Sequence, residues 1–161
     1  MDFWQRVHWF ATPECNERCR FCFKPDFEFL DSPEVVSELA HMLVEGGVKE
    51  VVYTGGEPTL LRNLSVGLDV LHNAGVDTSI HTNTTTLTPK KRDQLVGIVD
   101  EVAVPIDSMN RQTQKYLRKM DCLPKVMDLL EQLQNKPVRI EIHTVATSKN
   151  IDHIPKIYEY L

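Results

Sequence analysis

The chain has 161 residues, of which 42% are hydrophobic and 25% charged, and its formal net charge is −5. This composition is typical of one globular domain, and we expect a single domain over residues 1–161. The acidic balance argues against a nucleic-acid-binding surface, and no apolar run is long enough to predict a membrane span. We also expect no signal peptide, because the first ten residues lack a basic start followed by an apolar stretch.

The four cysteines are unevenly distributed. Cys15, Cys19 and Cys22 lie close together, whereas Cys122 stands alone. This spacing suits a ligand cluster better than a disulfide framework, and it predicts a reducing, cytoplasmic location.

Short apolar runs alternate with helical patterns along the chain. Strands are predicted at 7–12, 50–54, 76–82, 101–106 and 138–144. A helical pattern follows each strand: the predicted helices start at 33, near 64, at 89, at 124 and near 154. Ser32–Pro33 and Thr88–Pro89 are typical helix starts, with an N-cap followed by proline. Five strand–helix units in succession predict an α/β fold with a parallel sheet.

Unusual residues follow each predicted strand: Cys15–Cys22, Gly55–Pro58, Asn83, Asp107–Ser108 and Thr147–Asn150. Parallel α/β sheets place their chemistry at the carboxyl ends of the strands. We therefore expect these five loops to converge on one face of the domain.

The first loop carries the pattern CxxxCxxC in Cys15–Cys22. Thiolates are soft ligands that suit iron–sulfur clusters and zinc. Three cysteines can bind three irons of a 4Fe–4S cluster and leave the fourth iron open to another ligand. The alternative is a zinc site, with His8 as a weak fourth ligand, although structural zinc prefers four protein ligands. We expect Cys122 to be an apolar filler without a ligand role.

These motifs resemble those of the radical S-adenosylmethionine superfamily. The resemblance rests on CxxxCxxC with Phe21 before its last cysteine and on Thr54–Gly55–Gly56–Glu57–Pro58, which is similar to the GGEP motif. Thr82–Asn83 and Asp107–Ser108 with Arg118 extend it. Within the superfamily, VHWFATPECNERCRFCF, IDSMN and IHTVATSKN are most similar to viperin-like enzymes.

The resemblance implies a fold, two cofactors and a reaction. The fold is a parallel partial (β/α) barrel, in which about five of the usual six strand–helix units are present. The cofactors are a 4Fe–4S cluster and S-adenosylmethionine. Reductive cleavage of S-adenosylmethionine at the cluster gives a 5′-deoxyadenosyl radical, which abstracts hydrogen from a substrate.

The resemblance also implies roles for individual residues. The metal ligands are Cys15, Cys19 and Cys22, with Phe21 shielding the cluster. Gly55 and Gly56 let the backbone approach the methionine amino group, so we expect a bulky residue at Gly55 to block the cofactor and leave the cluster intact.

The remaining cofactor residues have alternatives. Thr54 adds a hydroxyl contact, and Glu57 either anchors the turn or accepts a hydrogen bond from the methionine ammonium. Asn83 either binds the methionine carboxylate or caps the next element. Asp107 or Ser108 would hydrogen-bond the ribose, although Pro105 occupies a position where relatives often have a ribose-binding serine. Arg118 would either pair with the methionine carboxylate or be a solvated helix residue.

Two partners are expected. Arg18, Arg20 and Lys24 surround the cysteine loop and would attract an acidic electron donor of the flavodoxin or ferredoxin type, unless they are simply a solvated basic surface. Because a sixth unit is missing, the fifth strand should present an open edge. We expect a dimer partner, another chain or a missing C-terminal segment to cover it.

The substrate is the least determined part. Glu141 and His143 alternate on the fifth strand and are candidate substrate contacts, unless His143 is a hydrogen-bonded interior histidine. Viperin-like enzymes bind a triphosphate partly with lysines, one of which aligns with Glu141 and another near Glu50. The reversed charge favours a peptide or small metabolite over a nucleoside triphosphate, the viperin-like alternative. An alternative of another class is a non-catalytic iron–sulfur or zinc module, but such a module has no need of the GGEP-like segment.

Overall fold

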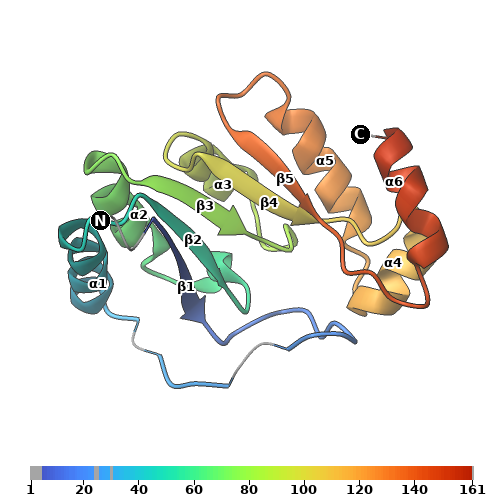
Figure 1. The fold of residues 1–161 in the computed structure, drawn as a ribbon, viewed down its shortest axis with the longest axis horizontal. Helices are drawn as coiled ribbons and strands as arrows, with labels where there is room; N and C mark the ends of the chain where they lie inside the picture. The colour runs from blue at the N-terminus through green and yellow to red at the C-terminus, as the bar shows by residue number, and fades with distance from the viewer. Residues whose placement is uncertain (1–4, 24–25, 30, 161) are drawn as a thin grey trace.

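The computed structural model describes residues 5–23, 26–29 and 31–160. Its centre is a parallel sheet of five strands in the order of the sequence. The strands are β1 (Arg6–Thr12), β2 (Glu50–Gly55), β3 (Asp77–His81), β4 (Glu101–Pro105) and β5 (Arg139–His143). The described strands leave β1 and β5 as the two edges, as expected of a partial barrel (Figure 1).

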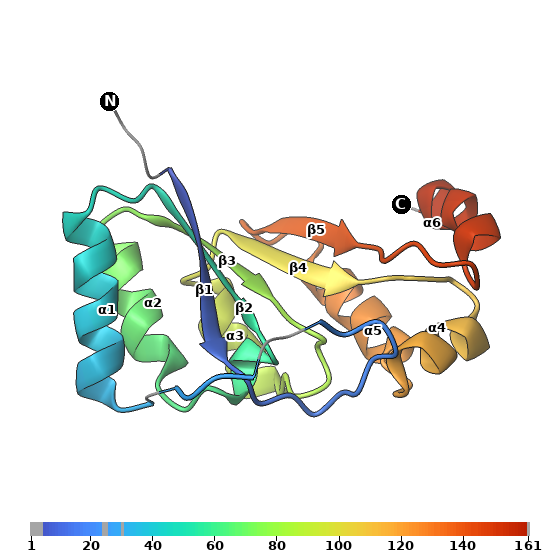
Figure 2. The ribbon, with the colours of Figure 1, turned by 60° about the horizontal axis from the view of Figure 1, so that its bottom comes forward.

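Helices follow the strands, and most of them lie along one face of the curved sheet, while the last helix lies beyond the carboxyl end of β5 (Figure 2). The helices are α1 (Pro33–Glu45), α2 (Leu64–Asn73), α3 (Pro89–Val96), α4 (Arg111–Arg118), α5 (Leu123–Leu133) and α6 (Ile154–Tyr160), with short 3₁₀ turns η1 (Pro58–Leu60) and η2 (Ile151–His153). Ser32 and Thr88 cap α1 and α3 by accepting hydrogen bonds from Val35 N and Lys91 N, as the sequence predicts.

Alternation along the strands separates a core face from a lumen face. Val51 and Tyr53 of β2 and Ile80 of β3 are fully buried under the helices, as part of one hydrophobic core. Their neighbours Thr54 and His81 point the other way and line a cavity. The helix-covered face therefore stabilises the domain, while the lumen face is available for chemistry.

All five predicted strands and the five predicted helices are present, with ends that differ by a few residues. The short helix α4 was not predicted as an element. It is polar, and Leu117 is its only buried apolar side chain, so its sequence lacks the apolar stripe by which a helix is recognised. No helix in the described part of the chain combines the length and apolar character needed to cross a membrane.

Candidate functional site

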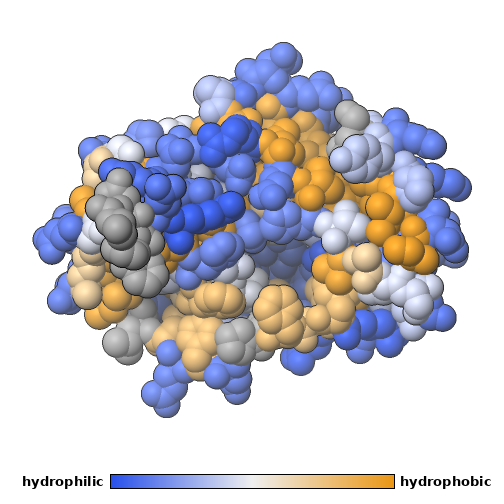
Figure 3. All heavy atoms as spheres, viewed as in Figure 1, coloured by the Kyte–Doolittle hydropathy of each residue, from blue (hydrophilic) through white to orange (hydrophobic). Residues whose placement is uncertain are grey.

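The segment after β1 crosses the carboxyl ends of the other strands (Figures 1 and 2). Together they enclose a cavity of about 490 Å³. It is visible as a hollow in the middle of the face shown in Figure 3. Residues from all five strands or the segments after them line this cavity. The predicted convergence of loops is confirmed for the first three loops, whereas at the fourth and fifth positions β4, β5 and Val145 line the cavity instead of the predicted loop residues.

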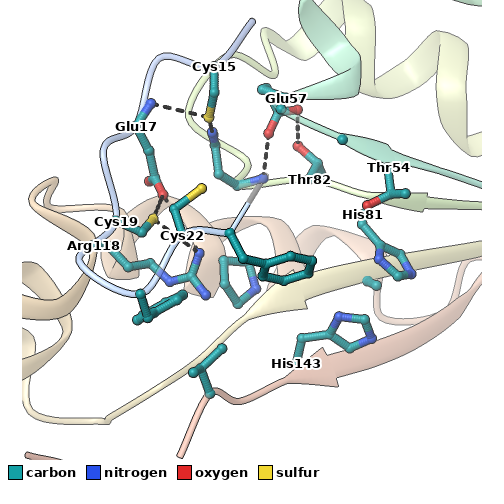
Figure 4. A pocket seen from close by; sticks show the side chains of 18 of the residues that line it. Cys15, Glu17, Cys19, Cys22, Thr54, Glu57, His81, Thr82, Arg118 and His143 are labelled. Carbon is teal, nitrogen blue, oxygen red and sulfur yellow. Dashed lines mark hydrogen bonds and ion pairs between the residues drawn. The ribbon is translucent and has the colours of Figure 1, made fainter. Parts of the chain in front are cut away.

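Cys15, Cys19 and Cys22 all line the cavity and are free thiols (Figure 4). The loop is held by the hydrogen bond from Cys22 N to Cys19 O (3.2 Å) and by that from Arg20 N to Leu117 O of α4 (2.8 Å). Burial raises the pKa of the Cys15 thiol, and it raises that of Cys19 to about 12. Without a ligand these thiols are protonated, so binding of a metal must release protons.

A buried ion network supports the cysteine loop from below. Arg118 is 9% exposed; its Nε is 2.7 Å from Asp107 Oδ2, and its Nη1 is 3.7 Å from Glu17 Oε2. The alternative of a solvated Arg118 is therefore wrong, while its pairing with the methionine carboxylate stays a prediction. Arg118 also lines the cavity, its Nη1 is 4.0 Å from Cys19 Sγ, and the Phe21 ring lies 5.3 Å from its Cζ. Phe21 itself lines the cavity.

The glycine pair packs against the start of the cysteine loop. Gly55 has φ +116°, and a Cβ there would lie 2.7 Å from Thr12 O. A Cβ on Gly56 would lie 2.5 Å from the carbonyl carbon of Glu14 and would overlap its oxygen. A side chain at Gly55 would therefore press on the end of β1, and one at Gly56 would press on the start of the cysteine loop. The expectation that a bulky residue at Gly55 leaves the cluster intact stays a prediction.

Glu57 anchors the turn after β2. Its side chain is 1% exposed, and Oε1 accepts hydrogen bonds from Thr59 N (3.2 Å), Thr59 Oγ1 (2.6 Å) and Thr82 Oγ1 (2.7 Å). Oε2 accepts from Asn83 N (2.7 Å). Burial raises the pKa of this carboxyl, while the donated hydrogen bonds oppose the shift. These contacts support the anchoring role over direct binding of a methionine ammonium.

Asn83 joins the end of β3 to the cysteine loop. Its Oδ1 accepts hydrogen bonds from Thr85 N and Thr85 Oγ1, which fixes a local turn. Asn83 does not cap the next helix, because Thr88 caps α3. Its Nδ2 donates to Asn16 Oδ1 (2.8 Å) and lies 3.9 Å from Cys15 Sγ. Asn83 also lines the cavity, so the carboxylate-binding role stays a prediction.

Asp107 and Ser108 are fully buried and engaged in internal contacts. Asp107 pairs with Arg118 and also accepts from Val145 N (2.8 Å), while Ser108 Oγ lies 2.6 Å from His153 Nδ1. Neither residue is among those that line the cavity. These contacts do not support the ribose role expected of them, because both side chains hold the chain between β4 and α4 in place.

The wall opposite the cysteines is polar. Thr54, His81 and His143 line it, and His143 Nε2 is 3.2 Å from Glu141 Oε2 (Figure 4). Glu141 and His143 therefore point to the same face, as their alternation predicts. Burial, together with the nearby His143 and His8, lowers the pKa of His81 to about 4, so this imidazole is neutral near pH 7.

Other predicted residues lie further from the cavity. Cys122 is fully buried, with its sulfur 3.5 Å from Gln114 Nε2, which agrees with a packing role. Arg18 is exposed, and Arg20 donates to Tyr116 O and stacks on the Tyr116 ring. Lys24 lies outside the described residues.

Glu17, His81 and Gln114 line or support the site, and sequence reasoning did not single them out. Glu17 sits inside the cysteine motif but is 5% exposed, and Gln114 Oε1 accepts hydrogen bonds from Asp107 N and Ser108 N. Of these three, only His81 could have been predicted from the sequence. It alternates with the apolar Ile80 on the third predicted strand, and the loop after that strand was already a candidate part of the site.

Comparison with known proteins agrees with this geometry. The model of the Radical SAM superfamily matches residues 9–161. A probable GTP 3′,8-cyclase of Sulfurisphaera tokodaii is 32% identical over 157 residues, which cover 92% of this chain and 49% of that protein. The GTP 3′,8-cyclase of Helicobacter pylori (strain 26695) is 28% identical over 93% of this chain and 50% of that protein. The chain thus spans about half the length of these curated relatives.

Solved structures show the same fold. Streptococcus suis SuiB superposes with a TM-score of 0.86 at 17% identity, over 99% of this chain and 37% of SuiB. The structure of anSMEcpe with bound AdoMet gives a TM-score of 0.80 at 21% identity, over 98% of this chain and 47% of that one. With three cysteines on the loop after β1, a parallel partial barrel and a family model that matches nearly the whole sequence, the chain belongs to the Radical SAM superfamily.

Proposed function

We propose that this chain is the core of an enzyme that reductively cleaves S-adenosylmethionine at a 4Fe–4S cluster and abstracts hydrogen from a substrate. One observation carries the proposal: the three loop thiols, the turn at Thr54–Glu57 and the polar lumen wall all line a single cavity. Cleavage at the cluster would therefore occur within reach of a substrate bound at the strand ends.

The thiols fit a cluster with one open iron. Cys15, Cys19 and Cys22 are free and reach the same cavity, and the fourth cysteine, Cys122, is fully buried beside Gln114. Soft thiolates at one end of a cavity are the donors that iron–sulfur clusters use. When bound, the cluster and S-adenosylmethionine supply one-electron reduction of the sulfonium and a 5′-deoxyadenosyl radical. The protein must hold both groups and limit access of water.

The chain's own residues suit that task. The turn at Gly55–Glu57 is fixed by the buried Glu57 carboxylate, so its backbone presents a rigid surface beside the cysteines. Arg118 carries a positive charge at the cavity wall, where it can pair with the methionine carboxylate. Phe21 adds an apolar surface that limits water near the loop.

The favoured substrate is a peptide or a small metabolite. Among the described lining residues Arg118 is the only lysine or arginine, and the proposal already assigns it to the methionine carboxylate, so no lysine or arginine of the lining is left for a triphosphate. A triphosphate at the β5 wall would meet Glu141 instead of a lysine, which is repulsive. A nucleoside triphosphate is the second candidate substrate, because relatives of this chain are named GTP 3′,8-cyclases.

Partners follow from the exposed features. We expect an acidic electron donor of the flavodoxin or ferredoxin type to approach Arg18 and the exposed Cys22. The edge of β5 carries exposed Ile140, and hydrophobic side chains gather near it on the face in Figure 3. We expect a further segment of chain, a partner or a second copy to cover this edge.

Electron paramagnetic resonance of the reconstituted, dithionite-reduced protein tests the cofactor site. Adding S-adenosylmethionine should change the cluster spectrum, because the cofactor binds the open iron. A complete 4Fe–4S cluster whose spectrum does not change when S-adenosylmethionine is added would contradict the proposal.

A parallel assay with the four ribonucleoside triphosphates tests the substrate class. We expect no nucleotide product. Turnover-dependent formation of a didehydro-nucleotide would overturn the preference for a peptide or small metabolite and restore the viperin-like reaction.

A further inference from the structure

Three potential ligand side chains meet on the lumen wall across β4. In the sheet register, His81 of β3 lies beside Ala103 of β4, which lies beside Glu141 of β5; His143 lies beside Pro105. Because Ala103 and Pro105 are small, side chains from β3 and β5 can reach each other over β4. One ligand atom each from His81, Glu141 and His143 lies within 4.8 Å of the others.

The cluster has an unsatisfied member. His143 Nε2 is 3.2 Å from Glu141 Oε2, and the His81 and His143 rings lie 4.4 Å apart, nearly perpendicular (Figure 4). His81 Nε2, by contrast, is buried and has no hydrogen-bond partner among the described residues. Such a buried polar atom is costly, and in native proteins an ordered water or ion usually satisfies it.

Two imidazoles and one carboxylate are a donor set that first-row divalent cations bind, with coordination positions left open. Such a cation holds its ligands at about 2.0–2.2 Å, so the three side chains must close in by roughly 1–2 Å. The Glu141 and His143 side chains are 43% and 40% exposed, so they have room to rotate.

We propose that His81, Glu141 and His143 bind a divalent first-row transition-metal cation, represented by Zn²⁺, in the cavity that also holds the cysteine loop. The cation would turn the negative charge at Glu141 into a net positive site. Its open positions would take a carboxylate or carbonyl oxygen of the substrate; this role, unlike the binding itself, rests on the proposed function.

Zinc binding to the full chain with a reconstituted cluster tests the site. One equivalent of Zn²⁺ is added anaerobically, unbound metal is removed, and bound zinc is measured by mass spectrometry and by X-ray absorption at the zinc edge. We expect about one zinc per chain with nitrogen and oxygen ligands, whose bonds of about 2.0–2.2 Å differ from zinc–sulfur bonds of about 2.3 Å.

Variants identify the ligands. Glu141→Gln and His143→Ala should each weaken zinc binding at least tenfold, with unchanged circular dichroism because both side chains are partly exposed. The matched control is His8→Ala, which removes another imidazole of the same cavity, 6.1 Å from the His81 ring, and should bind zinc as the unaltered chain does.

Zinc bound through sulfur, no bound zinc, or equal zinc affinity in the Glu141→Gln and His143→Ala variants would overturn the proposal. Zinc binding is measured without turnover, so a protein that binds zinc through nitrogen and oxygen but does not cleave S-adenosylmethionine would refute the proposed function and leave this site in place.

Discussion

Replacing Glu57 by glutamine separates a structural role of this carboxylate from a direct role in cofactor binding. Glutamine keeps one carbonyl oxygen, but its NH₂ group must face the backbone N–H of either Thr59 or Asn83, both of which now donate to the carboxylate. One buried donor then lacks an acceptor, which costs about 1–3 kcal/mol. At about 2 kcal/mol, the Tm of a domain of this size falls by about 4–8 °C.

The assay is thermal unfolding of the cluster-free protein, followed by circular dichroism. Glu14→Gln is the matched control, because the Glu14 side chain is exposed on the neighbouring loop, and its stability should stay within about 0.5 kcal/mol of the unaltered chain. If Glu57→Gln melts like the control but no longer binds S-adenosylmethionine, the carboxylate serves the cofactor directly and the anchoring argument is refuted.

Three further changes probe the cysteine loop and its support. Alanine at Cys15, Cys19 or Cys22 should abolish the visible absorbance of the reconstituted cluster, whereas the Cys122→Ala variant should keep it. Full iron loading of one of the three loop variants would exclude that cysteine as a ligand. Arg118→Leu leaves the buried carboxylates of Asp107 and Glu17 without their cation, so the free energy of unfolding in urea should fall by about 3–5 kcal/mol. Adding Asp107→Asn should restore part of this loss. A loss below about 1 kcal/mol would mean that these ion pairs contribute no more than solvent-exposed ones. Gly56→Ala should displace the loop at Glu14 and lower iron content, while Gly97→Ala, where a Cβ has nothing within 4 Å, should not; equal iron content in the two would contradict the packing argument.

The regular part of the fold follows from local sequence. Apolar runs predict the strands, proline after an N-cap marks the starts of α1 and α3 at Pro33 and Pro89, and Gly75, with φ +71°, follows the end of α2. The three candidate metal ligands could also be predicted from the sequence, because CxxxCxxC places three cysteines within one loop. Helix α4 was missed because most of its residues are polar and it is held by only a few buried side chains.

Side-chain partners formed over long sequence separations were not predictable. Arg118 is buried because Asp107 and Glu17 meet it from two other segments, and nothing near it in sequence indicates this. Asp107 and Ser108 were expected at the cofactor because they follow β4. Instead, the Asp107 carboxylate accepts a hydrogen bond from Val145 N, and Ser108 Oγ is hydrogen-bonded to His153. Motif position thus identified the right edge of the sheet without showing which side chains face the cavity.

The most direct test of the central claim is formation of 5′-deoxyadenosine. The protein is reconstituted anaerobically with iron and sulfide, reduced with dithionite and incubated with S-adenosylmethionine, and the products are measured by mass spectrometry. We predict 5′-deoxyadenosine and methionine in equal amounts, and neither from the Cys19→Ala variant. A protein with a complete cluster that binds S-adenosylmethionine but forms no 5′-deoxyadenosine would contradict the claim.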